Sequence, residues 1–157
     1  MTYSVMPVGA RDTIRGWANV SIDVVDALTG VLRRRHVGHN IITDVGLAVL
    51  AAGLAGGAVT ITHFALGDDN TAAVAGDTAL GHEVARPVIT GVSSAANVAI
   101  AQFYLSSGTL NGANLREAGL YVGEALLARY VYADADLTPK TSAVAVVFTW
   151  TITIVRS

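Results

Sequence analysis

The sequence contains no cysteine and little charge, and both absences limit what the protein can be. Without cysteine there is no disulfide, no thiolate metal site and no cysteine nucleophile. Charged residues make up 14% of the 157 residues, against ~25% in ordinary globular domains, whereas hydrophobic residues make up 52%. Because a surface with so few charges promotes association, we expect a homo-oligomer.

The charges that are present are nearly balanced, with 10 basic and 12 acidic residues and a net charge of −2. Such a chain lacks the positive field that non-specific nucleic-acid binding needs, so we expect no nucleic-acid partner. Residues 45–67 contain no Asp, Glu, Lys or Arg, a length that could cross a membrane. The Gly56-Gly57 pair breaks this stretch into two elements, which indicates that it does not span one.

Alternating hydrophobic and polar residues predict a mainly β fold. Residues 17–26 alternate with period 2, and residues 26–30 form a turn that ends in glycine, so residues 31–38 are the return strand of a hairpin. Further strands are expected at 60–66, 87–92, 98–105, 115–122, 126–132 and 144–155, whereas residues 77–85 are expected to form helical turns or irregular structure. Turns at this spacing indicate a single-domain antiparallel β-sandwich over residues 1–157, with residues 1–15 as a candidate N-terminal arm.

One helix is expected at about residues 44–55. Thr43 or Asp44 is a suitable N-cap, and Leu47, Leu50 and Leu54 share one helix face. We expect this helix to pack across one end of the sandwich.

The last strand is hydrophobic or β-branched on both faces. Val146, Phe148 and Trp150 alternate with Thr149, Thr151 and Thr153. A threonine face suits a second packed surface better than open water. We therefore predict that these three threonines lie at a subunit interface.

No set of residues predicts a metal or cofactor. The four histidines, His36, His39, His63 and His82, lack the spacing of a zinc site and are interpreted as surface or packing residues. Residues 68–70 and Asp77 offer oxygen ligands for calcium, but they do not fit the EF-hand pattern, and turn formation explains them. Residues 33–35 are three arginines, interpreted as charges that protect an edge strand or, alternatively, contact an acidic neighbour.

The sequence also lacks common catalytic and nucleotide-binding motifs: it has no GxSxG, P-loop or GxGxxG motif. Asp77, Glu83 and Glu117 could in principle serve glycoside hydrolysis, but arginines stand close to two of them. We interpret Glu83, Arg86, Arg116 and Glu117 as structural ion pairs, partly buried and close to strand starts. The sequence therefore predicts a protein that is not an enzyme.

An ordered string of short motifs remains. It runs from Asn40-Ile-Ile-Thr43 and Gly46 through Phe64-Ala-Leu-Gly67, Asp77-Thr-Ala-Leu80, Glu83-Val-Ala-Arg86, Arg116-Glu-Ala-Gly-Leu-Tyr121, Leu126-Leu-Ala-Arg129 and Lys140 to the closing Phe148-Thr-Trp-Thr-Ile-Thr-Ile154. This order resembles small virion proteins of tailed bacteriophages, among them tail-fibre, tail-tip and capsid-decorating proteins. The Arg116–Leu120 piece is similar to the collar-type fibre domain. The resemblance covers residues 40–154.

The resemblance implies a structural or attachment protein of the virion, assembled in the host cytoplasm. It favours a tail fibre or tail-tip component that docks on other virion proteins, with capsid decoration as the alternative. It also implies a homotrimer, since fibre and decoration proteins are commonly three-fold. A carbohydrate-binding module, stacking sugars on Tyr104, Tyr121, Tyr130 or Tyr132, is the alternative from another class.

Overall fold

The structure is a computed structural model that describes residues 14–89 and 91–156. Its elements are β1 (Ile14–Asp26), β2 (Leu32–Ile42), α1 (Asp44–Leu54), β3 (His63–Gly67), β4 (Glu83–Ala85), β5 (Gly91–Ala95), β6 (Val98–Leu105), β7 (Glu117–Val122), β8 (Ala125–Val131) and β9 (Val144–Arg156). The mainly β fold with one helix is confirmed. The 77–85 stretch differs from expectation, because it contains β4. The candidate arm overlaps β1 at Ile14 and Arg15, and residues 1–13 lie outside the described residues.

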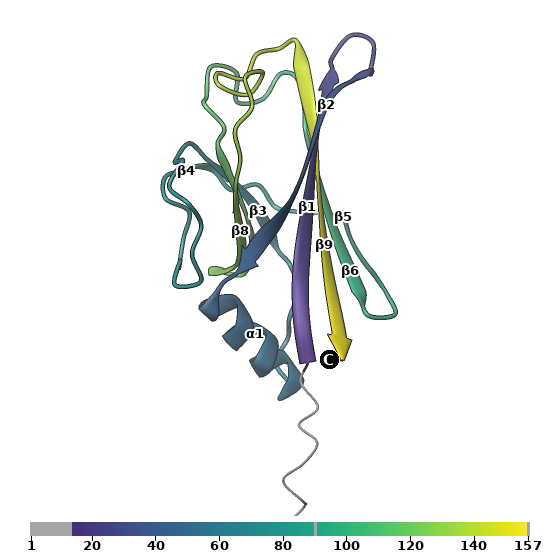
Figure 1. Cartoon of the computed structure of the whole chain (residues 1–157), viewed down its shortest axis with the longest axis vertical. Helices are drawn as coiled ribbons and strands as arrows, with labels where there is room; N and C mark the ends of the chain where they lie inside the picture. The colour runs from purple at the N-terminus through teal and green to yellow at the C-terminus, as the bar shows by residue number, and fades with distance from the viewer. Residues whose placement is uncertain (1–13, 90, 157) are drawn as a thin grey trace, which may run out of the picture.

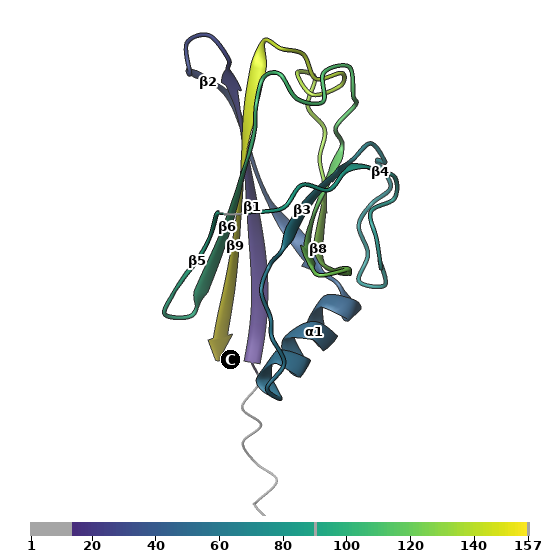
Figure 2. The same cartoon turned by 180° about the vertical axis from the view of Figure 1, so that it is seen from behind.

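All nine of these strands belong to one antiparallel sheet, in the order β4-β3-β7-β8-β2-β1-β9-β6-β5. The sheet curls at β2, which pairs with β1 along most of its length but with β8 only at Ile41 and Ile42. Figures 1 and 2 show β1, β9, β6 and β5 on one side and β3 and β8 on the other. The two layers of the expected sandwich are therefore the two halves of one curled sheet.

The core lies between these two halves. The inward side chains of β1 and β9 are those that the alternation predicted. Every second residue is buried, from Ala18 to Val24 in β1 and from Val144 to Ile152 in β9. The ring of Phe64 on β3 lies 4.8 Å from Phe148 and 5.7 Å from Trp150, centroid to centroid. Aromatic contacts across the interior thus join the halves of the sheet.

Helix α1 lies at one end of the sheet and contacts β8 through its first turn (Figure 1). The hydroxyl of Thr43 accepts a hydrogen bond from the N–H of Gly46 and donates one to the carbonyl of Leu126, at 2.5 Å. This residue therefore caps the helix and attaches it to the sheet. Leu47 and Leu54 are exposed, whereas Gly46 is buried against β8.

Candidate functional site

Residues 68–86, here called the covering segment, cross the outer face of β3, β7 and β8 and end in the edge strand β4 and Arg86. Leu80 in this segment joins Ala65, Tyr121 and Leu126 in a small apolar cluster outside the main core. The N–H of Leu80 donates to the hydroxyl of Tyr121 at 3.3 Å, and the guanidinium of Arg86 stacks 3.8 Å above the Tyr121 ring. The second half of the segment is therefore packed on the sheet by Leu80 and Arg86.

Two buried charges at the centre of this face hold the covering segment. Both carboxylate oxygens of Glu117 accept hydrogen bonds from backbone N–H groups, one from Gly81 at 3.0 Å and one from His82 at 2.8 Å. The Nε atom of Arg129 donates to the same carboxylate at 2.8 Å. Glu117 and Arg129 are almost completely buried, and either charge would be unfavourable there without the other. Each therefore neutralises its partner.

Arg129 extends this network to the turn at the start of the segment. Its Nη1 donates to Asp77 at 2.8 Å, and its Nη2 donates to the carbonyl of Thr71 at 3.1 Å and lies 3.6 Å from Asp69. Its Nε and both Nη atoms thus donate hydrogen bonds to protein groups. Burial works to lower the pKa of Arg129, but the hydrogen bonds to Asp77 and Glu117 outweigh it, and the pKa is raised.

Hydrogen bonds lower the pKa values of both aspartates, with a different main donor for each. The N–H and hydroxyl of Thr71 donate to Asp69 and are the main cause of its lowered pKa. Burial works to raise the pKa of Asp77, but the hydrogen bond from Arg129 outweighs it, and the pKa is lowered. Both carboxylates also form turns, as the sequence predicted, and neither needs a metal ion as a partner.

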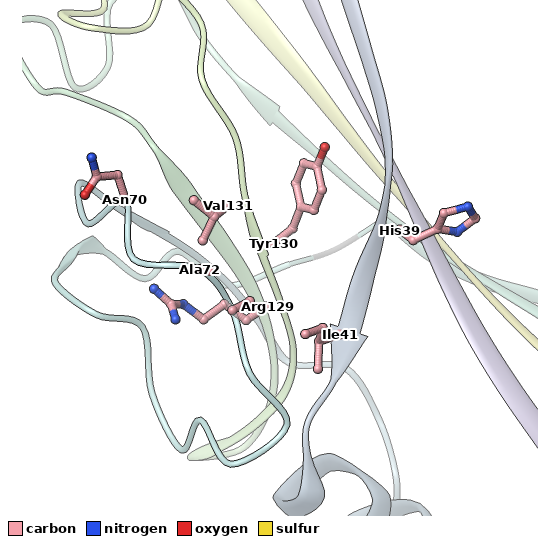
Figure 3. A pocket seen from close by; sticks show the side chains of 8 residues that line it. His39, Ile41, Asn70, Ala72, Arg129, Tyr130 and Val131 are labelled. Atoms are coloured by element: carbon pink, nitrogen blue, oxygen red, sulfur yellow. The ribbon is translucent and has the colours of Figure 1, made fainter.

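Arg129 also lines a pocket of about 340 Å³ between β8, β2 and the covering segment, together with His39, Ile41 and Tyr130 (Figure 3). An arginine in a pocket is a common anion site. Here, however, its donors are already directed to Glu117, Asp77 and Thr71. Three carboxylates around one guanidinium also disfavour a further anion, so the arrangement is structural.

The four charged residues expected in ion pairs are placed differently from one another. Glu83 and Arg86 form a surface pair at 2.8 Å. Glu117 is buried, but its partner is Arg129 and not Arg116. Neighbouring residues in a strand point to opposite faces, so Arg116 cannot approach Glu117 from the covered side.

The structure brings most of the motif string together at the covering segment. Asp77, Leu80, Glu83 and Arg86 belong to the segment, and Glu117, Tyr121, Leu126 and Arg129 lie beneath it. Glycines in the string leave no room for a side chain: a Cβ on Gly67 would lie 2.3 Å from a Glu117 oxygen, and one on Gly46 would lie 2.3 Å from the carbonyl oxygen of Leu127. The spacing of these motifs therefore specifies packing.

Three of the four histidines bond to neighbouring polar groups. His36 bonds to the buried carboxylate of Asp134, His82 bonds to Asp68 at 2.5 Å, and His63 bonds to the hydroxyl of Thr62. The Asp68 hydrogen bond raises the pKa of His82. Across residues 14–89 and 91–156, no group of three or more His, Asp or Glu side chains is placed to hold a metal ion.

Lys140 is a buried charge whose role the sequence did not reveal. Its side chain is fully buried, and Nζ donates to the carbonyl of Ser107 at 3.3 Å and to the side-chain oxygen of Asn111 at 3.1 Å. Burial lowers its pKa. The lysine therefore holds two loops together at the end of the sheet away from α1 (Figure 1).

The outer face of β2, β1, β9 and β6 carries the three predicted interface threonines. Thr149 lies in a row with Gln102, Ser21 and Val37, and the row of Thr151 contains Ile100, Asn19 and His39. Thr153 lies beside Val98 and Trp17. We call these eleven residues the threonine face. None of them is an acid, a lysine or an arginine.

Large apolar side chains are exposed on and beside the threonine face. Trp17 is 52% exposed and Val37 is 69% exposed. Tyr104 pairs with Val147, in the row that follows the Thr149 row on the side away from α1, and it is 61% exposed. The other tyrosines considered for sugar stacking are less accessible, since Tyr121 and Tyr132 are buried and Tyr130 is half-buried.

Comparison with known proteins adds no family and no function to these observations. No family model matches the chain, and neither curated proteins nor solved structures gave a significant match. Within the described residues, no helix has both the length and the apolar character needed to cross a membrane.

Proposed function

We propose that this chain is a non-enzymatic structural protein of a tailed-bacteriophage virion, a tail fibre or tail-tip component that self-associates through the threonine face. The observation that carries the proposal is this face, which is free of acids, lysine and arginine and bears exposed Trp17 and Val37. Interfaces are depleted of charge and enriched in Trp and Tyr, and this composition supports contact with a second copy.

The virion context rests on the resemblance of the motif string to phage proteins. The packing role of these motifs fits it, because a network built on Glu117 and Arg129 makes a rigid scaffold and offers no free catalytic group. The three-fold state also rests on the resemblance, since the threonine face by itself suits a dimer or a trimer equally. Capsid decoration remains the alternative position for the same kind of protein.

Sedimentation of the purified protein tests the self-association. We expect an oligomer at micromolar concentration, and we expect Thr151→Lys to dissociate it because the lysine places an unpaired charge at the centre of the face. Thr78→Lys, at an exposed threonine of the covering segment, is the matched control and leaves the oligomer intact. A well-folded wild-type monomer contradicts the proposal, and a dimer contradicts only the three-fold state.

Labelling the protein in intact particles tests the virion assignment. Imaging should place the label on the tail. A label on the head would replace the tail assignment by capsid decoration, and particles without label would contradict both.

A further inference from the structure

A groove of about 440 Å³ opens between α1 and the β5–β6 hairpin. Its walls include Leu50 and Val59 on the helix side and Val92, Ile152 and Ile154 on the sheet side. No lining residue is charged. Ile154 continues the inward face of β9, but it is 46% exposed because the core is open at this end. The groove therefore suits an uncharged, apolar occupant.

Among the described residues, the strand beside the groove, β5, is an edge of the sheet. β5 ends the strand order, all five of its residues are exposed, and its sequence contains no charge and no proline. β4, at the other end of the order, is flanked by the Glu83–Arg86 ion pair and Pro87. Natural proteins protect edges with such charges and prolines, so a bare edge is a site for pairing with an added strand.

The start of β1 lies at the same end of the sheet as this groove. β1 begins at Ile14, opposite Arg156, and Gly16 is opposite Ile154 of the groove. The N–H of Ile154 donates to the carbonyl of Asn97 in the β5–β6 turn, which places that turn at the same end. Residues 1–8, outside the described residues, have the sequence MTYSVMPV, which carries no charged side chain and places Met1, Tyr3 and Val5 at alternate positions.

We propose that residues 1–8 of a neighbouring copy bind as an extended segment along the β5 edge, with alternate apolar side chains in the groove. A strand added to an edge gains backbone hydrogen bonds, and a pocket beneath it selects alternate side chains. The occupant and the groove match in character, since neither has a charged side chain.

The direction of the strands selects a neighbouring copy over the same molecule. β1 runs away from the α1 end and β5 runs toward it, because β1, β9, β6 and β5 are antiparallel in turn. If residues 1–8 of the same molecule folded back beside β5, they would run parallel to it. Every pairing in the described sheet is antiparallel, the arrangement that is the more stable per residue. A second copy can supply the segment in the antiparallel direction.

Cysteine pairing tests this contact in the full chain, since the natural sequence has no cysteine. One preparation carries Val5→Cys and a second, with a distinguishing tag, carries Ser94→Cys in β5. After mixing and treatment with a short bismaleimide, we expect a heterodimer band several-fold stronger than that with Leu28→Cys as the second chain. Leu28 is 94% exposed in the β1–β2 turn, at the end opposite α1 (Figure 1). Adding Val92→Arg to the Ser94→Cys chain should lower the yield several-fold, because it places a charge in the groove.

The proposal is overturned if the heterodimer is no stronger than with Leu28→Cys, or if Val92→Arg leaves its yield unchanged. It is also overturned if a chain carrying both Val5→Cys and Ser94→Cys links mainly within one molecule. The inference rests on the proposed self-association, but the two fail separately. An oligomer by sedimentation with no specific crosslink overturns only the contact of residues 1–8, whereas a wild-type monomer overturns both.

Discussion

Replacing Glu117 by alanine removes the carboxylate that holds the covering segment on the sheet. The side chain is fully buried and accepts hydrogen bonds from Gly81, His82 and Arg129. Loss of one partner of a buried ion pair costs about 3–5 kcal/mol, because the remaining charge stays out of water. At ~2–4 °C per kcal/mol for a domain of this size, the melting temperature should fall by about 6–20 °C.

Thermal unfolding followed by circular dichroism and calorimetry at neutral pH measures this change. Arg33→Ala is the control, since Arg33 forms an exposed pair with Asp26 in the β1–β2 hairpin and such pairs contribute at most ~1 kcal/mol. A double variant, Glu117→Leu with Arg129→Met, removes both charges and should be less destabilised than Glu117→Ala. Equal small shifts for Glu117→Ala and Arg33→Ala would refute the reasoning.

Three further outcomes follow from the packing and the charges. Gly46→Ala should lower stability by about 1–3 kcal/mol despite the better helix propensity of alanine, because its Cβ meets the β8 backbone; Gly53→Ala, which meets only a half-exposed side chain, should not. The lowered pKa of Asp77 stabilises the folded state above about pH 4, and urea unfolding should show stability falling below that pH, less steeply in Asp77→Asn. The lowered pKa of Lys140 means that the unfolded chain binds more protons as the pH approaches the ordinary lysine pKa of about 10.4, so stability should rise with pH there relative to Lys140→Met; no difference in slope would contradict a buried charged lysine.

The residues of single strands and turns were enough to predict the fold class. Alternation in residues 17–26 and 144–155 identified the buried side chains of β1 and β9, because side-chain direction in a strand has period 2 wherever the strand lies. Thr43 predicted the start of α1, since capping depends on the next three residues alone. The sandwich layers were predictable too, but not that they are halves of one sheet that curls at β2.

Only the tertiary structure decided which charges meet. Proximity in sequence suggested Arg116 as the partner of Glu117, whereas the register of β7 and β8 places Arg129 beside it, and the covering segment brings Asp77 from 52 positions away. The same holds for the threonine face and the groove, which exist because β2, β1, β9 and β6 lie side by side and because α1 leaves one end of the core open. Periodicity determines which face of its own strand a residue occupies; contacts between distant residues depend on strand order and register, which the packing of the whole chain selects.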